Sequence, residues 1–260
     1  MINPNILPRP LRENLYRWWG FRTVSLGGFD MRVLPYDKQF WDGVQAGTWE
    51  PETLEALASV VGPGTAYCDI GAWIGPTVLF ARCRGARVTC FEPDPLAYER
   101  LLGNLRLNGA FDVRSFPCAL GKRDGLRTMG AMVGSLGKSA TSFFGTGAAQ
   151  TVEVASLTWE TARRLLELPV FDVLKMDIEG AEVELLPLLL DYLREHRPSL
   201  LLSTHWAFLP ESDRTSLSAS LSELGKIYKS TVALGGSGGL TVDFSDPLIA
   251  SKQAVFLLKP

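Results

Sequence analysis

From residue 51 onward, the sequence alternates between short apolar runs and segments with helical spacing, and this alternation most constrains the fold. Short apolar runs are typical of buried strands, and a helical segment between two of them serves as a crossover connection. Buried strands joined in this way form a mostly parallel sheet with helices on both faces. We therefore expect a three-layer α/β fold with a seven-stranded, mostly parallel sheet. The expected strands are residues 66–70, 87–91, 113–118, 171–176, 199–204, 227–234 and 254–258.

Two segments within this pattern depart from regular structure. A helix expected over about residues 181–195 contains Pro187, which predicts an interruption or a kink. Residues 121–150 are rich in Gly, Ser and Thr, which predicts a hairpin with long loops. We expect part of this second segment to act as a lid that cofactor or substrate orders.

Residues 1–50 do not follow the alternation, and we expect them to form a short N-terminal cap on a domain of residues 51–260. Residues 1–29 contain four arginines and one acid, and apolar side chains recur at helical spacing between residues 9 and 20. Such a stripe most often packs on its own domain, although it also suits a partner protein or peripheral contact with a membrane surface. Gly27 and Gly28 predict a hairpin turn after this helix. The stripe consists of Leu11, Leu15, Trp18 and Trp19.

Composition excludes several classes of protein. The 26 basic and 28 acidic residues leave a net charge of −2, without the basic footprint of a nucleic-acid-binding protein. No apolar run approaches the ~20 residues of a membrane span, and residues 1–20 lack the apolar core of a secretory signal, so we expect a cytoplasmic protein. The four cysteines form no C-x-x-C pair and the chain has two histidines, which disfavours a structural zinc site.

The strongest local motif lies between the first expected strand and the following helix, where residues 68–76 read CDIGAWIGP. Glu92 follows Asp69 by 23 residues, at the end of the next strand, where an acid suits the hydroxyls of a ribose. Trp73 stands in place of the second glycine of a dinucleotide-binding turn, and Asp69 adds negative charge, which disfavours a pyrophosphate. The motif therefore favours a ligand with an adenosine ribose and a cationic amino-acid end, such as S-adenosylmethionine. A nicotinamide-dependent oxidoreductase remains a competing hypothesis that Trp73 disfavours.

Three motifs together resemble the FkbM family of S-adenosylmethionine-dependent O-methyltransferases, which are class I enzymes. They are DIGAWIG at residues 69–75, FEPDP at 91–95 and LKMDIEGAE at 174–182. The GTWEP stretch at residues 47–51, Asn104 and Asn108 agree with the same family, whereas its members commonly have Asn at the position of Trp73. The resemblance covers residues 35–205. It implies a Rossmann-like fold and methyl transfer to a hydroxyl of a sugar, a glycan or another secondary metabolite.

The resemblance also implies a set of cofactor-binding residues. The methionine end of S-adenosylmethionine would lie against the glycine-containing turn, the ribose against an acid, and the adenine between two short segments. Asp69, Gly71, Ala72 and Gly75 form the first group, Glu92 the second, and Pro93, Asp94, Ala119 and Leu120 the third.

The third motif carries the candidate catalytic groups. In an extended backbone alternate side chains share one side, so Lys175, Asp177 and Glu179 point together toward the cofactor. Methyl transfer to a hydroxyl requires close approach and a base, and a carboxylate or a histidine serves as that base. His205, at the end of the fifth strand of the domain, is the histidine that the topology places nearest, although a purely structural role is an equal alternative.

Two further hypotheses concern the same residues and the basic helix. Asp177, Glu179 and Glu182 offer oxygen ligands for a divalent cation, although three acids at the start of a helix are also typical of a solvated helix terminus, which we favour. The non-enzymatic alternative is a cofactor-binding module that its N-terminal helix recruits to a partner or a membrane.

Overall fold

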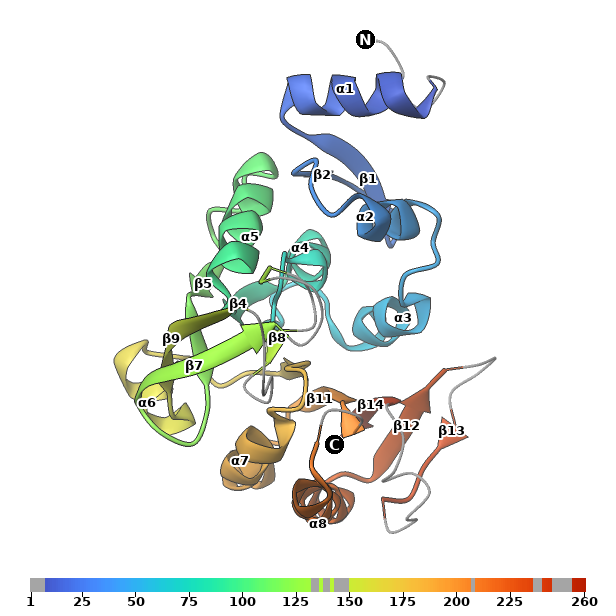
Figure 1. Cartoon of the computed structure of the whole chain (residues 1–260). Helices are drawn as coiled ribbons and strands as arrows, with labels where there is room; N and C mark the ends of the chain where they lie inside the picture. Colours follow the sequence, from blue (N-terminus) through green and yellow to red (C-terminus); the bar gives the residue numbers. More distant parts are fainter. Residues whose placement is uncertain are drawn as a thin grey trace.

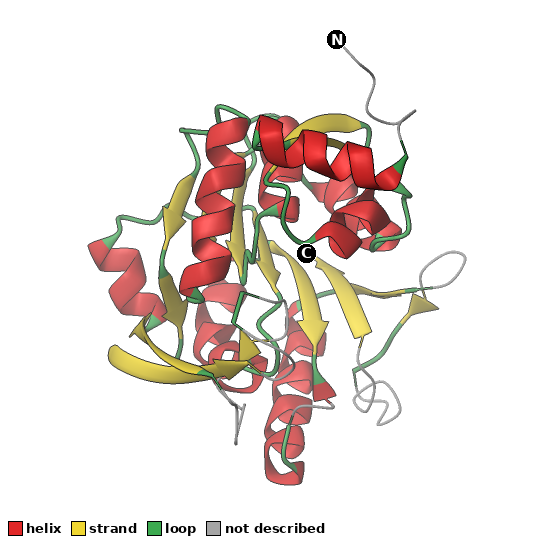
Figure 2. Ribbon diagram, turned by 45° about the horizontal axis from the view of Figure 1, so that its top comes forward, coloured by secondary structure: helices red, strands yellow, loops and turns green. Residues whose placement is uncertain are grey.

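The computed structural model describes residues 8–131, 136–137, 141–142, 150–206, 209–235, 240–244 and 254–260, which form three layers around a central sheet (Figures 1 and 2). The strand order in this sheet is β13-β12-β14-β11-β10-β3-β4-β5. The bounds are β3 (Ala66–Ile70), β4 (Arg87–Phe91), β5 (Arg114–Phe116), β10 (Val173–Met176), β11 (Ser199–Thr204), β12 (Ser230–Leu234), β13 (Leu240–Thr241) and β14 (Ala254–Lys259).

The direction of the strands confirms a mostly parallel sheet. Neighbours from β5 through β4, β3 and β10 to β11 are parallel, whereas β14 is antiparallel to both β11 and β12. The two-residue strand β13 pairs with β12 and makes the sheet eight-stranded, one strand more than the seven expected. The strands β4 and β5 lie on one side of β3, whereas β10 and β11, which come later in the chain, lie on its other side. The sheet therefore has its switch point between β3 and β10.

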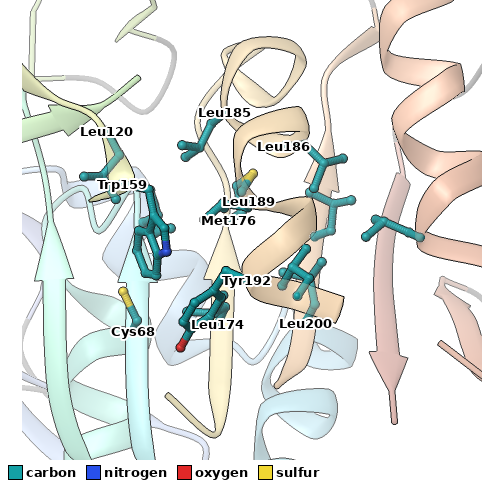
Figure 3. Close-up of a cluster of buried hydrophobic side chains, with 14 of the residues drawn as sticks. Cys68, Leu120, Trp159, Leu174, Met176, Leu185, Leu186, Leu189, Tyr192 and Leu200 are labelled. Atoms are coloured by element: carbon teal, nitrogen blue, oxygen red, sulfur yellow. The ribbon is translucent and has the colours of Figure 1, made fainter. Parts of the chain in front are cut away.

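Side chains that alternate along the strands build a separate core on each face. Cys68, Leu174 and Leu200 belong to one buried cluster (Figure 3), whereas Tyr67 and Val173, one position before the first two, belong to the other. Helices α6 (Trp159–Leu165), α7 (Glu182–His196) and α8 (Glu211–Ile227) pack in the first cluster. Helices α3 (Pro51–Val60), α4 (Pro76–Cys83) and α5 (Pro95–Leu107) pack in the second.

Helix α7 continues through Pro187, so the expected interruption is absent within its described bounds. A proline in a helix interior removes one backbone hydrogen bond and usually bends the helix. Here Pro187 is exposed, while Leu185, Leu186 and Leu189 are fully buried on the opposite side. Packing of these leucines against the sheet holds the helix together across the missing hydrogen bond.

The strand expected over residues 113–118 is two strands in different sheets. β5 ends at Phe116 and stays in the central sheet, whereas Cys118 begins a strand of a second sheet in the order β6-β9-β7-β8. The antiparallel pair β7–β9 confirms a hairpin in this region. Fourteen of the 30 residues in the segment expected to contain the lid, 132–135, 138–140 and 143–149, lie outside the described residues. The new bounds are β6 (Cys118–Leu120), β7 (Gly125–Ala131), β8 (Thr141–Ser142) and β9 (Thr151–Leu157).

The N-terminal hairpin is present and shares its core with the main sheet. Val24 and Met31 are buried in the same cluster as the helices α4 and α5. Asn104 of α5 accepts a hydrogen bond from the backbone N–H of Leu34 (2.7 Å), and Asn108 accepts one from Arg32 (2.9 Å). Two amides therefore join the hairpin to the domain. The cap elements are α1 (Arg9–Trp19), β1 (Arg22–Leu26), β2 (Phe29–Val33) and α2 (Lys38–Gln45).

Helix α1 packs through a face that coincides only in part with the one expected. Tyr16, outside the predicted stripe, is buried, with 3% of its surface exposed, whereas Trp18 is 81% exposed and Leu11 is 57% exposed. The prediction that the stripe packs on its own domain is therefore wrong for Leu11 and Trp18, while Leu15 and Trp19 are partly buried. Within the described ranges, no helix is long and apolar enough to cross a membrane.

Candidate active site

A cavity of about 500 Å³ opens at the carboxyl edge of the sheet, beside the switch point. It is lined by a glycine-containing turn, a group of charged side chains and several aromatic rings. All four predicted catalytic residues line it, together with two of the predicted cofactor-binding residues. The turn contributes Gly71, Ala72 and Trp73, the charged group consists of Glu50, Lys175, Asp177, Glu179 and His205, and the other rings are Phe40 and Trp49.

The turn between β3 and α4 lies against the segment that follows β10 and carries Asp177. Gly71 has a φ of +86°, and a Cβ built there would collide with the backbone carbonyl oxygen of Asp177, so only glycine fits. Trp73 has a φ of +48° and donates its backbone N–H to Glu92 Oε2 (2.7 Å). Glu50, Trp73 and Glu179, three of the six non-glycine residues with positive φ in the described structure, line the cavity. Such conformations cost energy and are typical of functional sites.

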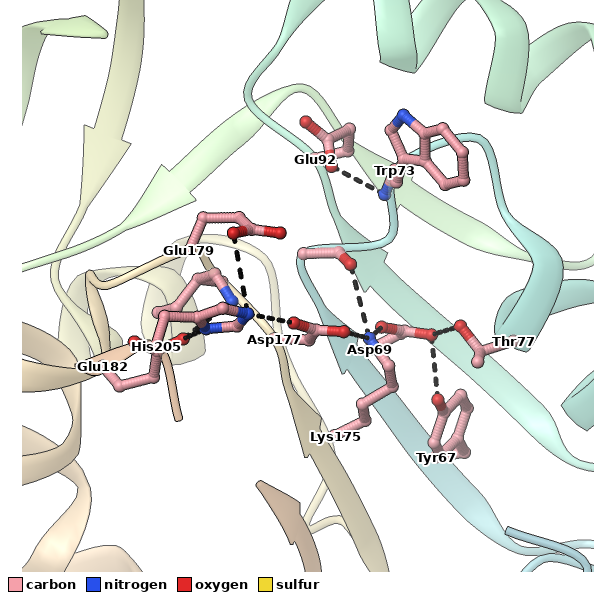
Figure 4. A network of polar contacts seen from close by, with 12 residues as sticks. Tyr67, Asp69, Trp73, Thr77, Glu92, Lys175, Asp177, Glu179, Glu182 and His205 are labelled. Atoms are coloured by element: carbon pink, nitrogen blue, oxygen red, sulfur yellow. Dashed lines mark hydrogen bonds and ion pairs between the residues drawn. The ribbon is translucent and has the colours of Figure 1, made fainter. Parts of the chain in front are cut away.

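Asp69 is fully buried and acts as a hydrogen-bond centre beneath the cavity (Figure 4). Its carboxylate accepts hydrogen bonds from Tyr67 Oη (2.8 Å), Thr77 Oγ1 (2.5 Å) and Lys175 Nζ (3.1 Å). Direct contact between Asp69 and the cofactor stays a prediction, since the observed partners all belong to the protein. The sequence analysis did not identify Tyr67 or Thr77, whose positions within a strand and a helix carry no motif.

Lys175 lies between two carboxylates, with Nζ 3.1 Å from Asp69 Oδ1 and 3.5 Å from Asp177 Oδ2. Burial by itself favours the neutral amine, but the charges of Asp69 and Asp177 outweigh it and raise the pKa of Lys175 above its usual range. Lys175 therefore keeps its proton and is a fixed positive charge rather than a base.

Glu92 and Asp94 occupy the end of β4 and the start of α5. Burial raises the pKa of Glu92 to about 7, although its carboxylate accepts hydrogen bonds from the backbone of Trp73 and Asp94. Asp94 caps α5 by accepting from Leu96 N, and its second oxygen accepts from Gly137 N (2.6 Å). These acids are buried and held by backbone N–H groups.

The remaining predicted cofactor residues are not among those that line the cavity. Gly75 has a φ of +89° and precedes α4, where a Cβ would lie 2.5 Å from Leu101 Cδ1. Pro93 is partly exposed, whereas Ala119 is buried. Leu120 packs in the core (Figure 3), so contact of its side chain with adenine stays a prediction.

His205 and three carboxylates form the most concentrated group of charges in the cavity (Figure 4). Nδ1 of His205 lies 2.8 Å from Glu182 Oε1, while Nε2 lies 3.5 Å from Asp177 Oδ1 and 3.6 Å from Glu179 Oε2. Burial lowers the pKa of His205, but the bond to Glu182 and the three negative charges outweigh it and raise the pKa to about 9. Burial, with Asp177 and Glu182, also raises the pKa of Glu179 to about 7 against the opposing charge of His205.

The structure brings two members of the predicted metal-ligand set, Asp177 and Glu179, together with His205 and places the third, Glu182, apart from them. Glu182 is fully buried beneath His205, where its Oε1 also accepts from the backbone N–H of Ile178 (3.1 Å). The residues whose ligand atoms lie within 4.8 Å of one another are Asp177, Glu179 and His205. Glu182 therefore orients the histidine instead of facing the cavity with the other acids.

Comparison with known families agrees with this geometry. The model of the methyltransferase FkbM domain matches residues 69–228, which include the β3–α4 turn and every member of the charged group except Glu50. The chain belongs to the FkbM methyltransferase family. This membership confirms the resemblance seen in the motifs and favours methyl transfer over the oxidoreductase hypothesis. No curated protein matches the chain.

Solved structures similar to the chain include other methyltransferases. Methyltransferase FkbM from Methylobacillus flagellatus KT is 18% identical, with a TM-score of 0.45 over 84% of this chain and 52% of that one. Fibrillarin from Aeropyrum pernix with bound S-adenosyl-L-methionine is 12% identical, with a TM-score of 0.46 over 93% of this chain and 83% of that one. The chain thus spans about half the length of the first structure.

The family implies S-adenosylmethionine as methyl donor, and the residues at the turn fit it. Gly71 and Ala72 expose backbone to the cavity, and the buried carboxylate of Glu92 stands at the end of the adjacent strand. A backbone that a ligand can approach closely, followed by an acid for the ribose, is the arrangement such a cofactor needs. The cavity volume is within the range of small-molecule sites.

Proposed function

We propose that the protein transfers a methyl group from S-adenosylmethionine to a hydroxyl oxygen of a sugar, a glycan or another secondary metabolite. The observation that carries the proposal is that one cavity is lined by both the β3–α4 turn and the Asp177–His205 pair. The turn suits the methyl donor, and the pair offers a base within reach of the same space.

S-Adenosylmethionine supplies an electrophilic methyl group when it is bound. A lone pair of the acceptor oxygen forms the new O–C bond, and the electron pair of the broken S–C bond returns to sulfur. Asp177 accepts the hydroxyl proton, and Lys175, 3.5 Å from its Oδ2, stabilises the ionised carboxylate beforehand. His205, whose Nε2 lies 3.5 Å from Asp177 Oδ1, orients this carboxylate.

Aromatic rings support a sugar or another flat-faced acceptor. Phe40 of α2 packs edge to face against Trp49 (ring centroids 5.1 Å apart) and against Trp73 (4.5 Å). All three rings line the same cavity as the charged group. Apolar ring faces bind the C–H face of a sugar while carboxylates accept its hydroxyls. The cap therefore contributes to the choice of acceptor in this proposal.

A methyl-transfer assay tests the proposal. Labelled S-adenosylmethionine is offered with a panel of glycans, nucleotide sugars and polyketides, and the methylated atom is identified by mass spectrometry and NMR. We expect a hydroxyl to be methylated by the wild-type protein and by the control Asp191→Asn, whose side chain is 98% exposed. Methylation of nitrogen or carbon alone, or methylation that Asp177→Asn leaves unchanged, would contradict it.

A further inference from the structure

Two carboxylate oxygens lie at ion-pair distance from His205 Nε2 in the cavity. Asp177 Oδ1 and Glu179 Oε2 lie 3.5 and 3.6 Å from this nitrogen, beyond the 2.7–3.2 Å of an N–H···O hydrogen bond. Two ligands bound at about 2.0–2.2 Å to one cation, with angles between 90° and 109°, lie about 2.8–3.6 Å apart. The two separations therefore match those between ligands of a common cation.

The histidine has the buried, fixed orientation of a metal ligand. His205 is 4% exposed, and its Nδ1 bonds to Glu182 Oε1 at 2.8 Å, so Nε2 points between the two carboxylates (Figure 4). Glu182 is in turn fixed by Ile178 N. A carboxylate that accepts from the second ring nitrogen is a common support of histidine ligands, because it fixes the ring and increases its basicity.

We infer that Asp177, Glu179 and His205 form a site for one divalent cation, with Glu182 as the residue that orients His205. Two carboxylate oxygens and one imidazole nitrogen suit a first-row ion such as Mn²⁺, since carboxylates favour Mn²⁺ and imidazole favours the transition metals. The three ligand atoms already lie within 4.8 Å of one another, so side-chain movements of about 1 Å bring them to bonding distance.

The charge and the surroundings of the group agree with a cation. Four acids, Glu50, Asp177, Glu179 and Glu182, act on this region of the cavity against the positive charges of Lys175 and His205. Nδ1 of His205 stays bonded to Glu182 Oε1 at 2.8 Å, which leaves Nε2 as the nitrogen that faces the cation. All three ligands line the cavity, which leaves the remaining coordination positions open to a small molecule.

This site deepens the proposed function and rests on it for its role. A cation there binds the acceptor through a hydroxyl, or through two neighbouring hydroxyls, and places the reacting oxygen next to the β3–α4 turn. The chemical class of acceptor is then a vicinal diol or another pair of oxygens that can chelate one ion.

Direct cation binding tests the site without any acceptor. Full-length protein with S-adenosylhomocysteine is freed of metal and titrated with MnCl₂, and free Mn²⁺ is measured by electron paramagnetic resonance. We expect one Mn²⁺ per chain. Glu179→Gln should raise the Kd at least about tenfold, and Glu182→Gln about 10- to 100-fold. The control Glu195→Gln, with a side chain 74% exposed on the same helix as Glu182, should bind as wild type does.

The outcomes separate the site from the proposed function. Stoichiometric binding that Glu179→Gln weakens supports the site, and circular dichroism establishes that the variant is folded. Failure to bind Mn²⁺ up to about 1 mM, or equal binding by wild type and Glu179→Gln, would overturn it. Methylation of a hydroxyl by a protein that binds no Mn²⁺ contradicts the site alone, whereas Mn²⁺ binding without any methyl transfer contradicts the function alone.

Discussion

The site has two halves, one beside β3 and β4 and the other beside β10 and β11, and they hold their carboxylates in different ways. On the side of β3 and β4, Asp69, Glu92 and Asp94 each accept at least two hydrogen bonds from the protein at 2.5–3.2 Å. On the side of β10 and β11, Asp177 and Glu179 stand 3.5 and 3.6 Å from His205. The first half is held by hydrogen bonds, whereas the second half contains longer ion pairs with His205 and Lys175.

The sharpest test of this contrast is Asp177→Asn. Loss of the proton acceptor should lower the rate of methyl transfer by about 10²- to 10⁴-fold, because general bases contribute about that much. The affinity for S-adenosylhomocysteine, measured by calorimetry, should change less than threefold or so, since the cofactor half is held by other residues. A variant that binds the cofactor and retains full turnover would favour a non-catalytic role for Asp177.

Lys175→Met tests the connection between the two halves. Removing the cation leaves Asp69 buried without its charge partner, so we expect the free energy of unfolding to fall by about 3–5 kcal/mol. Urea denaturation measures this change. Lys226→Met is the matched control, because its ion pair with Glu223 is exposed and should contribute less than about 1 kcal/mol. Equal effects of the two substitutions would mean that the buried pair adds no more stability than a surface pair.

Glu92→Gln tests the cofactor half. Hydrogen bonds from ribose hydroxyls to a carboxylate are stronger than those to an amide, and we expect the affinity for S-adenosylmethionine to fall about 10- to 100-fold. Glu99→Gln, on the exposed face of the following helix, should leave it unchanged. Wild-type affinity in Glu92→Gln would remove Glu92 from the cofactor site.

The smallest expected effect is on the pH dependence of stability. The pKa of Glu92 is about 7 in the folded protein and near 4.5 in the unfolded chain, so between these values the folded state binds one more proton. The contribution of Glu92 to the free energy of unfolding is therefore largest below pH 4.5. It falls as the pH rises toward 7, by at most about 1.4 kcal/mol per pH unit. Glu92→Gln should flatten that slope in urea titrations at several pH values; an unchanged slope would assign the pH dependence to other groups.

Sequence patterns predict the elements of the fold that local physics controls. The apolar run at 66–70 alternates between the two cores, and its position before a glycine turn identifies the carboxyl edge of the sheet. The period of two in an extended strand likewise placed Lys175 and Asp177 together, and their side chains lie 3.5 Å apart.

Other features depend on contacts between distant segments. Glu182 follows Asp177 by five residues, but Glu179 has a left-handed φ of +53° between them, and this turns Glu182 under His205. No local pattern reveals such a turn at a glutamate. The packing face of α1 was predicted only in part, because the helical spacing of apolar residues did not include Tyr16, which is buried, and did include Trp18, which is exposed.

The backbone contact between Gly71 and Asp177 has a consequence for how this enzyme family can diversify. In the proposed function, two main chains in contact set the spacing between the turn that holds the methyl donor and the proposed base, Asp177. Changes in Phe40, Trp49 or the cap would then alter which acceptor enters without changing that spacing. Acceptor choice and reaction geometry would be separable properties of the site, and selection could act on one without disturbing the other.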